Sequence, residues 1–194
     1  MGCSASKNTD ITNEDLEFLK KRTGYDEKTI KELYEGFKQD CPDRKLSKEK
    51  FVEMYKMFFS SGNPEKFCEN VFRTFDVDKN DHIDFKEFLL AIGITSRGSS
   101  EEKLKWAFRM YDINGDGLIE KEEMTKIVQA LYEMLGQGLE DMPVDTPQER
   151  TALIFEKMDS NHDSRLSLEE FLNGCTEDPK LGRFLSVIGE EQRN

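Results

Sequence analysis

The sequence lacks any apolar run long enough to cross a membrane as a helix. No stretch approaches the ~18 apolar residues that a spanning helix needs, and no apolar signal segment lies near the amino terminus. Cysteine is also scarce, because Cys3, Cys41, Cys68 and Cys175 are widely spaced and form no paired motif. This spacing favours a reducing compartment over a disulfide-bonded secreted protein. We therefore expect a cytoplasmic location, with any membrane contact made through an anchor or a surface.

Positive charge is in short supply. The 28 basic residues face 40 acidic ones, which gives a formal net charge of −12. This balance disfavours nucleic-acid binding and suits cations or basic partner peptides. The chain nevertheless contains 14 Phe and 8 Met, more than a disordered acidic chain would carry. Its 194 residues can bury a sizeable core, so we expect a folded acidic protein.

Catalytic signatures are missing as well. The sequence contains no nucleophile–base pair and no glycine-rich phosphate loop. Its two histidines, His82 and His162, lie in polar stretches between helical patterns, and neither has a partner for catalysis or for binding a transition metal. We therefore expect no enzymatic activity.

A helical repeat organises the chain. Apolar residues recur at helical spacing on both sides of four polar stretches, which predicts four helix–loop–helix units and an almost entirely α-helical fold. The eight apolar stripes, in chain order, are Ile30, Leu33, Tyr34, Phe37; Phe51, Met54, Tyr55, Phe58; Cys68, Val71, Phe72, Phe75; Phe85, Phe88, Leu89, Ile92; Leu104, Ala107, Phe108, Tyr111; Met124, Ile127, Val128, Leu131; Ile154, Phe155, Met158; and Leu168, Phe171, Leu172, Cys175.

The units group into two halves. Residues 95–100 form a polar breaker, and Ser99 with Glu102 can make a capping box that starts the next helix. An additional amphipathic helix is expected over residues 10–21. We predict an amino-terminal segment over residues 1–24, paired units over residues 25–96 and 97–177, and a tail over residues 178–194.

The polar stretches carry oxygen ligands at the spacing of an EF-hand loop. Calcium takes about six to eight oxygen ligands, and this twelve-residue loop supplies them from positions 1, 3, 5, 7, 9 and 12. Position 7 uses its backbone carbonyl and position 12 is a bidentate glutamate. Position 6 turns sharply, which favours glycine. Position 8 is apolar because it lies in a short strand that pairs with the neighbouring loop.

Loop 112–123 fits this pattern at every position. Gly117 occupies position 6 and Ile119 occupies position 8. A solvated acidic turn would match only if all these placements coincided by chance. We predict the firmest calcium site here, and the first to fill if the loops fill in order. Its expected ligands are Asp112, Asn114, Asp116, the carbonyl of Leu118, Glu120 and Glu123.

Two further loops keep the ligand set but lack glycine at position 6. Asp81 stands there in loop 76–87 and Ser164 in loop 159–170, and a positive φ costs serine more than aspartate. We predict binding in both, with the later loop weakened. The expected ligands of the first are Asp76, Asp78, Asn80, the carbonyl of His82, Asp84 and Glu87; those of the second are Asp159, Asn161, Asp163, the carbonyl of Arg165, Ser167 and Glu170. Three calcium ions are thus expected, with Mg²⁺ as a competitor.

The first loop, 39–50, has lost this chemistry. Lys50 replaces the glutamate at position 12, Cys41 stands at position 3 and Arg44 at position 6, close to Pro42. We predict that this loop does not bind calcium and that its cysteine is structural.

The amino terminus matches a myristoylation signal. Gly2 is the expected acceptor, and Ser6 stands at the required distance. One myristoyl chain binds membranes only marginally, with an association constant of about 10⁴ M⁻¹. Palmitoylation of Cys3 would add a second chain and anchor the protein firmly. The alternative is that Cys3 is an exposed free thiol.

Together these features resemble the neuronal calcium sensor family. The resemblance covers essentially the whole chain and rests on the acylation signal, the disabled first loop with Asp40-Cys41-Pro42, and three intact loops. Residues 95–98 (Thr-Ser-Arg-Gly) and 105–108 (Lys-Trp-Ala-Phe) add to it. Three usable loops look more like the frequenin and neurocalcin branch than like recoverin. Departures from the family are Cys3, Asp81 and Ser164.

The resemblance implies two EF-hand pairs side by side in a non-enzymatic protein. Calcium would expose an apolar groove that binds helical segments of membrane-associated receptors, kinases, cyclases or channels. The matching groove residues are Leu33, Tyr34, Phe37, Phe51, Tyr55, Phe58, Phe59, Phe85 and Leu89. Two alternatives remain open, a calcium buffer and a constitutive regulatory subunit resembling calcineurin B. The tail over residues 180–188 is expected either to cover the groove or to be a frayed end.

Overall fold

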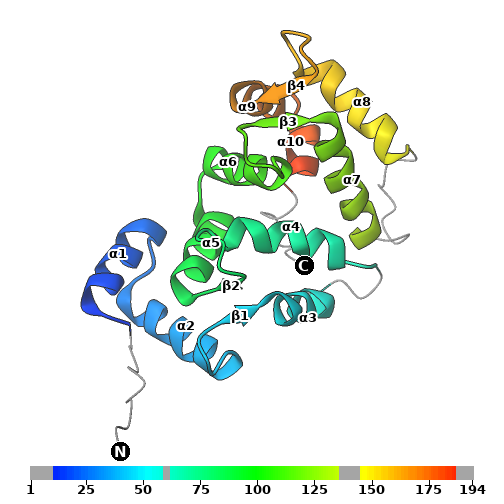
Figure 1. Cartoon of the computed structure of the whole chain (residues 1–194). Coiled ribbons are helices and arrows are strands. Elements are labelled where there is room, and N and C mark those ends of the chain that lie inside the picture. The colour runs from blue at the N-terminus through cyan, green and yellow to red at the C-terminus, as the bar shows by residue number, and fades with distance from the viewer. Residues whose placement is uncertain (1–10, 59–61, 136–144, 187–194) are drawn as a thin grey trace, which may run out of the picture.

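The computed structural model describes residues 11–58, 62–135 and 145–186. Figure 1 shows helices with only short strands between them, which confirms the all-α fold expected from the sequence. The first half contains α1 (Asn13–Thr23), α2 (Glu27–Asp40), β1 (Leu46–Ser47), α3 (Lys48–Phe58), α4 (Glu65–Phe75), β2 (His82–Ile83) and α5 (Phe85–Arg97). The second contains α6 (Ser100–Tyr111), β3 (Leu118–Glu120), α7 (Lys121–Leu135), α8 (Pro147–Met158), β4 (Arg165–Ser167), α9 (Leu168–Glu177) and α10 (Pro179–Leu185).

Four helix–loop–helix units follow one another along the chain. They are α2–α3, α4–α5, α6–α7 and α8–α9, each with a loop and a short strand between its helices. The predicted domain boundary after residue 96 falls one residue before the end of α5, and the division into halves stays a prediction. None of the helices in the described ranges has the length and apolar character needed to cross a bilayer.

Neighbouring loops are joined by antiparallel strand pairs. β1 pairs with β2, with Leu46 opposite Ile83, and β3 pairs with β4, with Ile119 opposite Leu166. These four residues occupy position 8 of their loops, and all are at most 1% exposed. Position 8 thus lies in the strand pairs, as the sequence predicted, and its apolar side chains belong to the buried core.

Capping residues set where the helices begin. Ser99 and Glu102 form the expected capping box before α6. Thr146 and Glu149 form another before α8, where Pro147 occupies the first helical position. The start signal that the sequence predicted at Ser99 is thus used, and Thr146 supplies a second one of the same kind.

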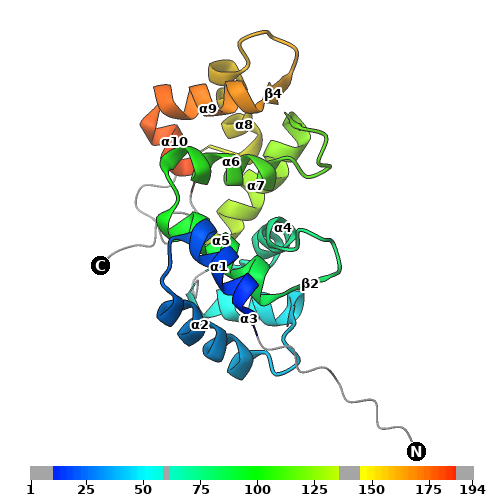
Figure 2. The same cartoon turned by 90° about the vertical axis from the view of Figure 1, so that its left-hand side faces the viewer.

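The extra amino-terminal helix packs along α5, as Figure 2 shows. Leu16 and Leu19 of α1 are 5% and 0% exposed. A salt bridge of 2.5 Å joins Lys86 of α5 to Asp15 of α1. A Cβ built on Gly93 would meet the Thr23 side chain at 3.0 Å, so the absence of a side chain there permits the close approach of the two helices.

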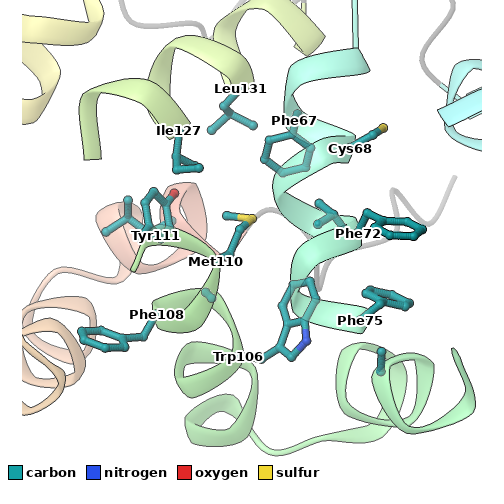
Figure 3. Close-up of a cluster of buried hydrophobic side chains, with 14 of the residues drawn as sticks. Phe67, Cys68, Phe72, Phe75, Trp106, Phe108, Met110, Tyr111, Ile127 and Leu131 are labelled. Atoms are coloured by element: carbon teal, nitrogen blue, oxygen red, sulfur yellow. The ribbon is translucent and has the colours of Figure 1, made fainter. Parts of the chain in front are cut away.

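Helix α4 connects the two halves because it packs against both α6 and α7. Figure 3 shows Phe67 of α4 beside Leu131 of α7, with Met110 of α6 close by. Phe75, at the end of α4, meets Trp106 of α6 edge to face with 5.8 Å between ring centroids. The hydrophobic core is therefore continuous from one half to the other.

The tail contributes a helix to the second half. α10 packs against α9 and α6, and Leu185 is 1% exposed. The ring of Phe184 lies 6.2 Å from that of Tyr132, with the guanidinium of Arg150 5.5 Å above it. Residues 179–185 are thus packed rather than frayed, and residues 187–194 lie outside the described ranges.

Candidate metal centres

The aspartate at position 1 organises each intact loop from within. Asp112 is the residue that ends α6, and it is 6% exposed. It accepts hydrogen bonds from the backbone N–H groups of Asp116 (3.1 Å) and Gly117 (3.0 Å). These bonds curl the loop around the carboxylate. The same pair recurs from Asn80 (3.0 Å) and Asp81 (3.0 Å) to Asp76, and from Asp163 (3.2 Å) and Ser164 (3.0 Å) to Asp159.

The glutamate at position 12 closes each loop. Oε1 of Glu123 accepts from the N–H groups of Ile113 and Asn114, both at 3.0 Å, and Oε2 accepts from the N–H of Glu120 at 3.0 Å. Both oxygens of this 5% exposed carboxylate therefore face the loop. Oε1 of Glu87 accepts from Val77 at 2.8 Å and its Oε2 from Asp84 at 3.0 Å, while the corresponding atoms of Glu170 accept from Ser160 at 3.2 Å and Ser167 at 2.9 Å.

Side chains at positions 3 and 5 contact each other in each intact loop. Nδ2 of Asn114 donates to Asp116 at 3.2 Å, and equivalent amide–carboxylate contacts join Asn80 to Asp78 (2.7 Å) and Asn161 to Asp163 (3.1 Å). The side chains at positions 3 and 5 are thus in direct contact in each of the three loops.

The spacing of these oxygens fits calcium. Carboxylate oxygens of Asp76, Asp78 and Glu87 all lie within 4.8 Å of one another. Calcium–oxygen bonds measure about 2.3–2.6 Å, so two ligands of one ion are at most ~5 Å apart. The donors are hard oxygens, which suit calcium or magnesium rather than a softer transition metal. The residues therefore fit the ion that the sequence predicts.

The backbone turns left-handed twice in each intact loop. In loop 112–123 both positions are glycine, Gly115 with φ 74° and Gly117 with φ 88°. The other loops place side-chain-bearing residues there: Lys79 (φ 57°) and Asp81 (φ 63°), and His162 (φ 59°) and Ser164 (φ 66°). Each such residue costs roughly 1 kcal/mol. A left-handed turn was expected from the sequence at position 6 alone; the turn at position 4 was missed, although Gly115 was the signal for it.

Side chains at position 9 have protein partners. Asp84 and Ser167 accept from the backbone N–H of Glu87 (2.9 Å) and Glu170 (3.3 Å), which starts α5 and α9. Glu120 instead faces Arg165 across the β3–β4 pair, with Oε1 3.2 Å from Nη2. The sequence assigned only the carbonyl of Arg165, and its side-chain role was missed because the strand register decides which residues face each other.

Loop 39–50 has a similar shape with the opposite charge at its end. Lys50 stands at position 12, where the other loops have a glutamate, and its ammonium group donates to the carbonyl of Asp40. Arg44 takes the left-handed conformation with φ 62°. Cys41 is 3% exposed, and burial raises the pKa of its thiol, which disfavours the reactive thiolate. A cation thus stands where the other loops have a carboxylate, and the absence of calcium binding in this loop stays a prediction.

The predicted groove residues divide by burial. Tyr34, Phe37, Phe51, Phe85 and Leu89 are buried, and Leu33 and Tyr55 are partly buried. The side chain of Phe58 and all of Phe59 lie outside the described residues. A cavity of about 220 Å³ opens between α2, α3 and α5 and includes Leu33, Phe37 and Met54 in its lining. The groove itself stays a prediction. The lipidation candidates Gly2 and Cys3 also lie outside the described ranges.

Comparison with known proteins shows the family to which this chain belongs. Four helix–loop–helix units with paired loops define the chain as an EF-hand protein, and residues 101–176 match the family model described as an EF-hand domain pair. Two curated relatives, each named Neuronal calcium sensor 1, come from Lymnaea stagnalis and Aplysia californica. Each is 44% identical over 194 residues, covering 99% of this chain and 100% of the relative. The chain belongs to the neuronal calcium sensor family, as the sequence motifs indicated.

Proposed function

We propose that this chain is a calcium sensor without catalytic activity, and that it binds three calcium ions through loops 76–87, 112–123 and 159–170. The observation that carries this proposal is the arrangement of position 1 and position 12 carboxylates, which recurs in all three loops. Bound calcium would supply charge that draws these carboxylates together. Magnesium competes less well because it demands shorter bonds and near-octahedral geometry.

Closing of the loops is the proposed source of movement. Position 1 ends the first helix of a unit, and position 12 lies in the first turn of the second. An ion shared by both therefore pulls on two helices at once, and in sensor EF-hands this opens the helix pair and exposes an apolar groove. The cavity lined by Leu33, Phe37 and Met54 is the proposed starting point of that groove.

The proposed partners are apolar helical segments of membrane-associated receptors, kinases, cyclases or channels. A groove lined by aromatic and aliphatic side chains suits the apolar face of an amphipathic helix. The net charge of −12 favours basic helices and disfavours nucleic acid. A calcium buffer and a constitutive subunit of the calcineurin B type are the competing functions.

Fluorescence of the apolar dye ANS distinguishes a sensor from a buffer. Calcium is expected to raise ANS fluorescence of this protein, because opened helix pairs expose apolar surface. Magnesium at the same concentration serves as the control and is expected to produce a smaller rise. A flat response to calcium, with binding confirmed by calorimetry, would identify a buffer. A partner that stays bound in chelator would identify a constitutive subunit.

We also propose that the protein associates peripherally with membranes through a myristoyl group on Gly2, reinforced if Cys3 is palmitoylated. Gly2→Ala is expected to abolish co-sedimentation of the co-translationally acylated protein with lipid vesicles, because it removes the acceptor. Ser4→Ala is the matched control and should sediment normally. Unaltered sedimentation of Gly2→Ala would contradict the acylation proposal, and Cys3→Ser tests the second chain separately.

A further inference from the structure

Arg73 joins α4, the helix that leads into loop 76–87, to the start of loop 112–123. It lies in the last turn of α4, three residues before Asp76, where loop 76–87 begins. Its Nη2 donates to the carbonyl of Met110 at 2.7 Å, and its Nη1 donates to the carbonyl of Asp112 at 3.0 Å. One guanidinium therefore binds the end of α6 and the first residue of loop 112–123.

These two carbonyls need a partner from elsewhere in the fold. The last carbonyls of a helix have no N–H donor within the helix itself, and a cation near them is favourable. Arg73 meets that need with a rigid planar fork, which fixes the direction of both bonds. The carbonyl of Asp112 belongs to the same residue whose carboxylate organises loop 112–123. A displacement of Arg73 therefore acts directly on a proposed calcium ligand.

The guanidinium of Arg73 is partly buried. Its Nε is buried and has no hydrogen-bond partner in the described part of the chain, so the two Nη contacts are what position it. Burial lowers the pKa of Arg73, while the nearby carboxylates of Asp112 and Glu123 favour its charged form. The cation thus lies within the electrostatic reach of position 1 and position 12 of loop 112–123.

The helix that carries Arg73 is also the one that calcium would move. α4 is the first helix of the unit around loop 76–87, and Asp76 ends it by donating its N–H to the carbonyl of Phe72 at 2.9 Å. The same helix packs on α6 and α7 across the continuous core in Figure 3. A second contact between the halves is the exposed salt bridge between Lys66 and Glu133, at 2.9 Å. It touches no calcium loop.

We propose that Arg73 couples loops 76–87 and 112–123, so that calcium bound in either loop strengthens calcium binding in the other. This coupling rests on the proposed calcium binding. Loading at Asp76 immobilises the end of α4, and Arg73 then holds the backbone of Asp112 in the geometry that the second ion needs. Since the backbone of Asp112 is then already ordered, loop 112–123 binds its ion with higher affinity. The effect is reciprocal because coupling free energies are.

A double-mutant cycle tests the coupling. Glu87→Gln disables loop 76–87, and the amide resonance of Gly117 reports calcium binding in loop 112–123 by NMR. In the parent protein Glu87→Gln is expected to raise the calcium concentration for half-saturation of Gly117 by about fivefold or more, the usual lower range of coupling. In an Arg73→Met background the same substitution should shift it by less than about twofold. Arg73→Lys keeps the charge without the fork and should also lose the coupling.

Lys66→Met is the matched control, since it breaks a contact between the halves outside the loops, and it should preserve the fivefold shift. Equal shifts in the parent and Arg73→Met backgrounds, or no shift in the parent, would overturn the coupling. If Arg73→Met does not fold, Arg73→Lys decides alone by the same criterion. A Gly117 resonance that never responds to calcium would overturn the proposed site itself, an outcome distinct from a response that is uncoupled.

Discussion

Glu123→Gln is expected to reduce the number of calcium ions bound by one. Both oxygens of Glu123 accept hydrogen bonds from the backbone of loop 112–123, and this proposed ligand connects the loop to the first turn of α7. Glutamine replaces one anionic oxygen with an NH₂ group, which donates hydrogen bonds and cannot bind a cation. The NH₂ group would also face backbone N–H donors, either those of Ile113 and Asn114 or that of Glu120, with which it cannot form hydrogen bonds.

The loss of affinity should exceed the ~10–100-fold that removal of an outer-shell partner costs at metal sites. Isothermal calorimetry measures it as a change in stoichiometry. Glu122→Gln is the matched control, because Glu122 is the exposed neighbour in the same helical turn, and it should leave the stoichiometry unchanged. If Glu123→Gln binds as many ions as the parent, the assignment of position 12 is wrong.

Phe67→Ala is expected to lower the free energy of unfolding by about 3–5 kcal/mol. Phe67 is 1% exposed and lies in α4 beside Leu131 of α7, where the two halves share their core. Truncation removes the buried ring and leaves a cavity that helices from both halves line. Domains are stable by only about 5–15 kcal/mol, so this is a large fraction of the total.

Urea unfolding followed by circular dichroism measures the change, in the calcium-free protein so that ion binding does not contribute. Phe18→Ala is the control, since Phe18 in α1 is 48% exposed, and it should cost about 0.5 kcal/mol or less. Comparable effects of the two substitutions would show that the contact between the halves contributes little to stability.

Local spacing explains how much of the fold was predictable. The stripe of Met124, Ile127, Val128 and Leu131 needs only helical geometry, and all four residues are at most 1% exposed in α7. The capping boxes at Ser99 and Thr146 act over three residues and start α6 and α8, and the one at Ser99 was expected from the sequence.

The candidate sites were predictable to a similar depth. Loop ligands act over twelve residues, so the spacing from Asp112 to Glu123 indicates which side chains meet. The sequence did not indicate that Glu120 faces Arg165, because the register of β3 and β4 depends on how two separate units pair. It also did not separate core from groove, since Phe37 and Leu33 share one helical face but differ in burial.

By itself the sequence determined the helical units, the family and the spacing of the candidate ligands in each loop, because all of these depend on residues close together in the chain. Only the tertiary structure decided which distant groups meet. Arg73 lies 37 residues from Met110 and 39 from Asp112, and no local pattern predicts that its guanidinium binds their carbonyls. Such contacts arise when helices pack in three dimensions, where a partly buried cation must find acceptors wherever the fold brings them.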